Sequence, residues 1–90
     1  MTDSIHSEEM IALRAWLRTA RENHGWSMRD LAAKLGKAHN YVQRVEDGDR
    51  RLDVVEFVRY CEALVIDPAD GLALVLTARQ GLEACQSNDS

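Results

Sequence analysis

Apolar residues in the first part of the chain recur every three or four positions. Between Met10 and Ala20 this spacing places them on one face of a helix. Ser7, which stands ahead of two glutamates, suits the capping position before a helix, and Gly25 suits the position after its end. The pattern therefore predicts a helix over about 7–23.

Two shorter helices are predicted next, separated by a tight turn. Ser27 is followed three residues later by Asp30, a spacing that marks a helix start, and Gly36 marks the end of that helix. A third helix is expected over 39–47, ahead of the turn-forming Gly48. Its apolar side is a narrow stripe, and four polar side chains stand on the opposite side: His39, Asn40, Gln43 and Arg44.

The second half of the chain predicts two further helices. Asp53 and Glu56 have the spacing of a capping box, and Pro68 after Asp67 starts a last helix that runs to about Gln80. The helix after Asp53 is expected to bury one stripe of five residues: Val54, Val58, Cys61, Leu64 and Val65. Nothing in the chain alternates like a strand, so the sequence predicts an all-α domain of five helices.

Length and composition narrow the class of protein. Ninety residues, of which 46% are hydrophobic and 29% charged, fit one compact globular domain. The chain has neither an apolar run long enough to span a bilayer nor a signal peptide, so we expect a cytoplasmic protein that does not contact membranes. Its cysteines and histidines are scattered, which predicts no metal site and no cofactor. A helical chain this small offers few polar groups that could share a pocket. We therefore expect no enzymatic activity and no catalytic residues.

The charges are divided unevenly along the chain. The net charge of −4 taken alone argues against a nucleic acid partner, because DNA binding depends on neutralising phosphates. Residues 14–51, however, hold nine basic and five acidic residues, a net charge of +4, and the remainder carries −8. This division is typical of a basic contact face on an acidic body. Solvated helix faces of mixed sign would give the same counts.

The stretch LAAKLGKAHNYVQRVEDGDRR resembles the Xre/Cro-type, lambda-repressor-like family of bacterial and phage DNA-binding domains. The resemblance covers roughly 13–76 and implies a compact helix-turn-helix domain over 1–82, with the motif at about 27–48. The third helix, 39–47, would then lie in the DNA major groove. Residues 83–90 lack an apolar pattern and are expected to form a disordered tail. The residues that match the family pattern are Leu31-Ala32, Leu35-Gly36, Tyr41-Val42, Val45-Glu46 and Gly48.

The resemblance implies that His39, Asn40, Gln43 and Arg44 read base edges. Their chemistry suits this role, since Arg44 can form two hydrogen bonds to guanine and Asn40 or Gln43 can form two to adenine. His39 can donate or accept according to its tautomer. The alternative is that these residues form an ordinary solvated helix face.

Contacts to DNA phosphates are expected from five residues around these readers: Arg29, Lys37, Tyr41, Arg50 and Arg51. Tyr41 has an alternative, which is to pack half-buried at the edge of the third helix. The resemblance also implies a buried ion pair between Arg21 and Glu46. Three departures from the family pattern weaken the expected docking on DNA, namely Met28, Lys37 and Ala38.

The last predicted helix is apolar over more than one face. One core needs only one apolar row, so the surplus predicts a homodimer interface formed by Leu72, Leu74, Val75 and Ala78. A dimer would read two half-sites of a palindromic operator. The alternative is that the N-terminal segment, with Ile5 and Ile11, covers this surface within one chain.

These features predict a sequence-specific DNA-binding transcriptional regulator, a repressor, whose partner is double-stranded DNA. The basic segment and the polar face of the third helix favour this function. The acidic remainder and the three departures favour an alternative, an antitoxin that binds a cognate toxin, or another protein-interaction module with weak or no DNA binding.

Overall fold

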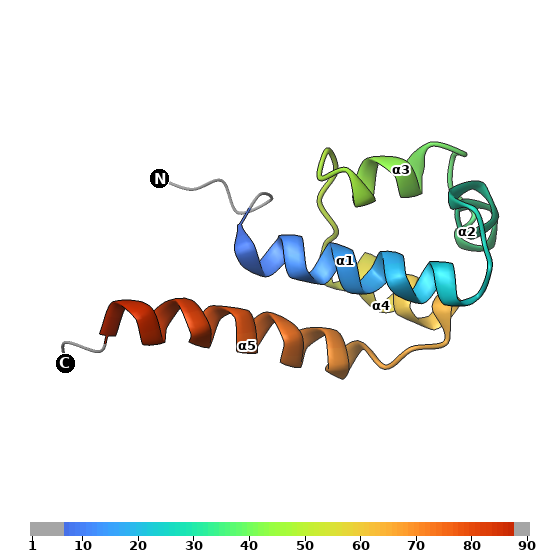
Figure 1. Cartoon of the computed structure of the whole chain (residues 1–90). Helices are drawn as coiled ribbons and strands as arrows, with labels where there is room; N and C mark the ends of the chain where they lie inside the picture. Colours follow the sequence, from blue (N-terminus) through green and yellow to red (C-terminus); the bar gives the residue numbers. More distant parts are fainter. Residues whose placement is uncertain (1–6, 88–90) are drawn as a thin grey trace.

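The structure of the protein is a computed structural model that describes residues 7–87, with side chains through Arg79. Over these residues it contains five helices and no strand (Figure 1). The predicted all-α fold is therefore confirmed. The helices are α1 (Glu8–Asn23), α2 (Met28–Leu35), α3 (Tyr41–Glu46), α4 (Val54–Leu64) and α5 (Pro68–Ser87).

Side-chain caps fix the starts of the first, second and fourth helices, as the sequence predicts. Ser7 accepts a hydrogen bond from the first turn of α1. At the start of α2 the Ser27 hydroxyl accepts from the Asp30 amide at 3.0 Å, and the Asp30 carboxylate accepts from the Ser27 amide at 2.9 Å. Asp53 and Glu56 form the same reciprocal pair at the start of α4, at 2.7 and 3.0 Å. Each box satisfies amides that the first helical turn leaves unpaired.

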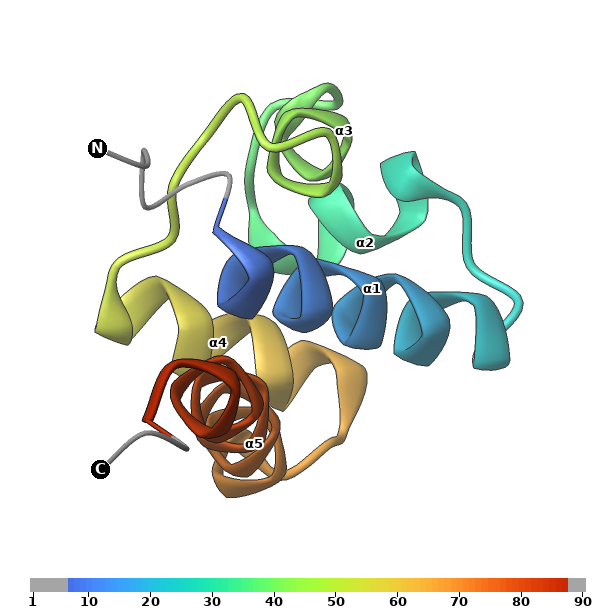
Figure 2. The same cartoon turned by 60° about the vertical axis from the view of Figure 1, so that its left-hand side comes forward.

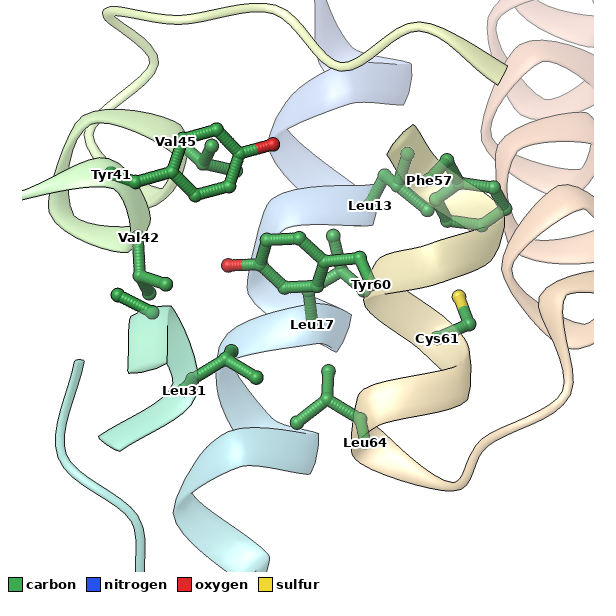
Figure 3. Packing of buried hydrophobic residues seen from close by; sticks show 11 residues of the cluster. Leu13, Leu17, Leu31, Tyr41, Val42, Val45, Phe57, Tyr60, Cys61 and Leu64 are labelled. Atoms are coloured by element: carbon green, nitrogen blue, oxygen red, sulfur yellow. The ribbon is translucent and has the colours of Figure 1, made fainter. Parts of the chain in front are cut away.

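Helix α1 runs through the middle of the molecule. Figure 2 shows α2 and α3 on one side of it and α4 and α5 on the other. Figure 3 shows side chains from α1 to α4 meeting around Leu17 and Tyr60, which are among the largest fully buried residues. Helix α5 joins this core through Gly71, where an added Cβ would lie 2.7 Å from the Trp16 ring and 2.9 Å from the Phe57 ring. Any larger residue at this position would push α5 away from α1 and α4.

Helix α3 is shorter than the sequence predicts. It begins at Tyr41, whereas the prediction began at His39, so His39 and Asn40 lie in the turn before it. The physical reason is Ala38, the residue just before the predicted start, which has no side-chain acceptor for the amides of a first turn. Its carbonyl instead accepts from the Tyr41 amide at 3.0 Å, which closes a tight turn.

The predicted buried stripe of α4 is wrong for three of its five residues. Val54, Val58 and Val65 are 78%, 36% and 80% exposed, and only Cys61 and Leu64 of that stripe are buried. The helix is rotated so that Phe57 and Tyr60 enter the core beside Cys61 and Leu64. Aromatic rings bury more apolar area than valines, and this difference favours the rotated packing.

Helix α5 continues to Ser87, past the end predicted near Gln80. Residues 83–87 of the expected disordered tail are therefore helical, while 88–90 lie outside the described residues. The segment that follows Gln80 contains leucine, alanine, glutamate and glutamine, which favour helix, and the single Gly81 costs only about 1 kcal/mol within it.

Val65 ends α4 in the left-handed conformation, at φ 58° and ψ 46°. This conformation is strained for a β-branched residue. We predict that Val65→Gly raises the free energy of unfolding by about 1 kcal/mol, because glycine adopts positive φ at no steric cost. Urea denaturation followed by circular dichroism measures the change.

The matched control is Val55→Gly, which removes another exposed valine, 58% against 80% for Val65, from a position within α4. Here glycine is expected to lower stability by about 0.5–1 kcal/mol. If both variants lowered stability alike, Val65 would not be strained in the folded protein.

Candidate nucleic-acid interface

Helices α2 and α3 are joined by a tight turn over residues 36–40. Gly36 ends α2 at φ 68° and ψ 31°, and the Lys37 amide donates to the Ala32 carbonyl at 2.9 Å. The amide of Gly36 also donates to Ala33, so this geometry reverses the chain while pairing two carbonyls in the second half of α2. Ala32 and Val42 are fully buried and hold the two helices to the core. The arrangement is that of a helix-turn-helix motif.

The four predicted base readers all lie on the surface of this motif. Gln43 and Arg44 are exposed on α3, and His39 and Asn40 are exposed in the turn that leads into it. In both views α3 lies at the edge of the molecule opposite α5 (Figures 1 and 2). Guanidinium and amide groups at such an edge have the donors and acceptors that distinguish base pairs in the major groove.

The five predicted phosphate contacts fall into two groups. The first group is exposed: Arg29 lies on α2, Lys37 in the turn before α3, and Arg51 in the loop after α3. Tyr41 is only 7% exposed and belongs to the core cluster, so it is buried more deeply than the half-buried alternative expected for it. Burial raises the pKa of its hydroxyl above the usual value. Arg50 is engaged within the chain, because its guanidinium lies over the Tyr41 ring at 4.8 Å and pairs with a carboxylate of α4.

That carboxylate belongs to Glu56. Arg50 Nη1 donates to Glu56 Oε1 at 3.1 Å, and Arg50 Nη2 donates to Oε2 at 2.8 Å. Together with the Asp53 amide, this guanidinium lowers the pKa of Glu56 to about 2. The capping-box spacing identifies Glu56 as part of a helix start, but no sequence rule connects it to Arg50 across the loop. Glu56 is therefore a residue beside the candidate interface that sequence reasoning misses.

The implied ion pair between Arg21 and Glu46 is present and buried. Arg21 Nε and Nη2 donate to the Glu46 carboxylate at 2.7 and 3.1 Å, and Nη1 donates to the Trp26 carbonyl at 2.7 Å. The hydrogen bonds to Glu46 raise the pKa of Arg21 above its usual value. Because Glu46 is the last residue of α3, the pair fastens the end of this helix to α1.

A stack of three side chains braces the end of α1. The rings of His24 and Trp26 lie 4.1 Å apart and nearly parallel, and Lys34 Nζ sits 4.4 Å from the centre of the Trp26 ring. His24 Nε2 also lies within hydrogen-bond distance of the Leu64 carbonyl at the end of α4. These contacts fix the turn between α1 and α2 at the base of the motif.

The described residues include no group of three or more His, Cys, Asp or Glu side chains placed to hold a metal ion. Within the same part of the chain, no helix is both long and apolar enough to cross a membrane.

Fold and site together define a helix-turn-helix protein, and comparison with known proteins places it more closely. The helix-turn-helix family model HTH_3 matches residues 17–70, more than half of the chain. A solved XRE-family like protein from Pseudomonas syringae pv. tomato str. DC3000 is 35% identical, with a TM-score of 0.73 over 82% of this chain and 92% of that one. A comparison with curated proteins finds no match. The chain belongs to the XRE-type helix-turn-helix family of DNA-binding regulators.

We predict that Glu46→Ala lowers the free energy of unfolding by about 3–5 kcal/mol. The substitution leaves the positive charge of Arg21 buried without its negative partner. Breaking a buried ion pair in this way is strongly destabilising. Chemical denaturation measures the loss.

The matched control is Arg18→Ala, which breaks the exposed pair with Glu22 on the same helix. That change should stay within about 0.5 kcal/mol. Equal losses in the two variants would mean that burial adds nothing to the Arg21–Glu46 pair.

Proposed function

We propose that the protein is a sequence-specific transcriptional repressor that inserts α3 into the DNA major groove. The observation that carries this proposal is the outer face of α3, where Gln43 and Arg44 are exposed on a helix that is buried on its other side and fastened at its end. Membership of the XRE-type family supports it. Repression by occupying a promoter requires only that the protein bind there. It therefore needs no additional surface for contacting other proteins.

The roles within the proposed complex follow from chemistry and position. Arg44 pairs with guanine, Gln43 or Asn40 with adenine, and His39 with an adjoining base edge. The exposed side chains of Arg29, Lys37 and Arg51 neutralise phosphates on either side of α3. Met28 and Ala38 supply no polar group to the backbone of the DNA, so docking rests on the basic side chains.

We further propose that the repressor is a homodimer that joins through α4 and α5. Six of the seven large hydrophobic residues that are exposed among the described residues belong to α4, its C-cap or α5. Three of them, Val54, Val58 and Leu72, line an apolar groove of about 240 Å³. A soluble monomer rarely leaves such side chains together in water.

The proposed DNA-binding function favours a second copy of this chain as the partner that covers the apolar groove. One recognition helix contacts too few base pairs to select a single operator, and a two-fold axis supplies a second helix one DNA turn away. The axis also lets valines of one α4 meet leucines of the partner α5, as a self-complementary interface requires. Of the residues predicted for the interface, Leu72 is 60% exposed, Val75 lines the groove, and Leu74 and Ala78 are half-buried. Of the two residues named for the alternative cover, Ile11 is 49% exposed and does not line the groove, and Ile5 lies outside the described residues.

A second function, a protein-interaction module such as an antitoxin that binds a toxin, is favoured by the same apolar groove and by the acidic charge outside residues 14–51. Under this function the groove binds a foreign chain, and DNA binding is weak or absent. The two functions are separated by DNA binding at moderate salt.

We predict that Arg44→Ala weakens binding to the preferred sequence by about 1–3 kcal/mol and leaves binding to mixed-sequence DNA nearly unchanged, as expected of a base reader. The preferred sequence is obtained first, by selecting duplexes from a randomised pool with the wild-type protein. Fluorescence anisotropy on both duplexes measures the two affinities.

Salt dependence provides the control. With three basic side chains per subunit on phosphates, the log–log slope of affinity against salt should be about −5 for a dimer. Arg51→Ala should weaken both duplexes and make the slope shallower. If the wild-type protein selects no duplex even at low salt, the repressor proposal fails and the interaction module takes its place.

We predict that Leu72→Glu keeps the helical circular dichroism, sediments as a monomer and binds the selected duplex at least about tenfold more weakly, because a charge is placed in an apolar interface. The fold tolerates the change since Leu72 is 60% exposed. Ile11→Glu is the control, because Ile11 is 49% exposed on α1 and does not line the groove. A wild-type protein that sediments as a monomer at micromolar concentration would contradict the dimer.

A further inference from the structure

Arg50 stands among the basic residues expected to bind DNA, yet its guanidinium is occupied. It forms two hydrogen bonds to the Glu56 carboxylate, at 3.1 and 2.8 Å, and a third to the Arg51 carbonyl at 2.7 Å. Its carbon also lies 4.8 Å from the centre of the Tyr41 ring. A two-pronged pair of this kind fixes the orientation of both side chains.

The acceptor of this pair is fixed in turn. Glu56 Oε1 accepts a hydrogen bond from the Asp53 amide at 3.0 Å, and the Glu56 amide donates to the Asp53 carboxylate at 2.7 Å. The carboxylate is therefore held by the start of α4 on one side and by Arg50 on the other. About one fifth of the Glu56 side chain and one third of the Arg50 side chain remain exposed.

Tyr41 connects this pair to the recognition helix. It is the first residue of α3, it is 7% exposed, and its ring has Arg50 at 4.8 Å and Lys37 Nζ at 5.6 Å. The start of α3 lacks a side-chain cap, since Asn40 makes no such hydrogen bond. Contacts from outside the helix must therefore hold its first turn, and the Tyr41–Arg50 contact is one of them.

We propose that Arg50 is a positioning residue and contacts no phosphate: held by Glu56, it fixes Tyr41 at the start of α3 and the loop that presents Arg51. The inference rests on the proposed DNA-binding function and deepens it. It assigns to Glu56, an acid beside the interface, a favourable effect on DNA binding, although a carboxylate near phosphates is otherwise unfavourable.

The substitution Glu56→Gln separates the two roles of Arg50 by the sign of its effect. Glutamine still serves in a capping box, so the start of α4 is preserved. If Arg50 bound a phosphate, removing the carboxylate would release it and affinity would rise. If Arg50 positions Tyr41 and the loop, the loss of the pair lowers affinity for the selected duplex. We expect a loss of about five- to twentyfold, toward the lower end of what a charge-assisted pair contributes, because both side chains are partly exposed.

Two further variants calibrate this result. Glu62→Gln removes the same charge from an exposed position on α4 and should change affinity only slightly, through weaker repulsion of DNA. Arg50→Ala should leave the salt slope of binding at its wild-type value, whereas Arg51→Ala should make it shallower by about 1.8 for a dimer, or 0.9 per subunit.

Wild-type protein and the selected duplex are measured first, so that failure of DNA binding itself is seen separately. Circular dichroism at the assay temperature identifies any variant that is unfolded. If Glu56→Gln is unfolded, the salt slope of Arg50→Ala alone tests whether Arg50 contacts a phosphate. Weaker binding by folded Glu56→Gln together with an unchanged Arg50→Ala slope supports the inference. A gain of affinity, no change, or a shallower Arg50→Ala slope overturns it while leaving the repressor function in place.

Discussion

The orientation of α3 depends on the buried ion pair between Arg21 and Glu46. A helix of six residues is far shorter than the roughly 12–15 residues that an isolated helix needs for stability in water. The pair joins α3 to α1 and, through the third hydrogen bond of Arg21, to the Trp26 carbonyl in the turn before α2. Because buried pairs contribute little net stability compared with apolar substitutes, we interpret this one as selecting a single placement of α3 against α1.

The two ends of α3 are held by different chemistry. Glu46 at its end is fixed by a buried charge, and Tyr41 at its start is fixed by burial and by the guanidinium of Arg50. Between them, Val42 and Val45 are almost fully buried, and Gln43 and Arg44 take no part in this packing. The positions of α3 that pack in the core and the positions proposed to read DNA are thus separate, so under the proposed function a change at position 43 or 44 alters recognition without disturbing the fold.

The sequence predicts the helix ends well, because these depend on residues close together in the chain. The capping residues Ser7, Ser27 and Asp53 and the helix-ending Gly36 each act on neighbours within four residues, so their spacing is sufficient evidence. The rotation of α4 is not local: its sequence contains two overlapping apolar stripes, and packing of the aromatic rings against α1 chooses between them.

The candidate site divides in the same way. The exposure of Gln43 and Arg44 on α3 follows from helical periodicity, whereas His39 and Asn40 are exposed because they lie in the turn before the helix. The Arg21–Glu46 pair follows from family resemblance. The Arg50–Glu56 pair follows from neither, because its partners meet only after the loop between α3 and α4 has folded.

The uneven distribution of charge described first has a kinetic consequence. Residues 27–51, which contain α2 and α3, carry a net charge of +2, and residues 53–87, which contain α4 and α5, carry −4, so the domain is an electric dipole that points through α1. In the field of a polyanion such a dipole experiences a torque that turns its positive end forward. At physiological ionic strength the field is felt over about 8 Å, so this rotation takes place in the last step of approach. Under the proposed function, a larger share of encounters with DNA then begins with α3 facing the groove.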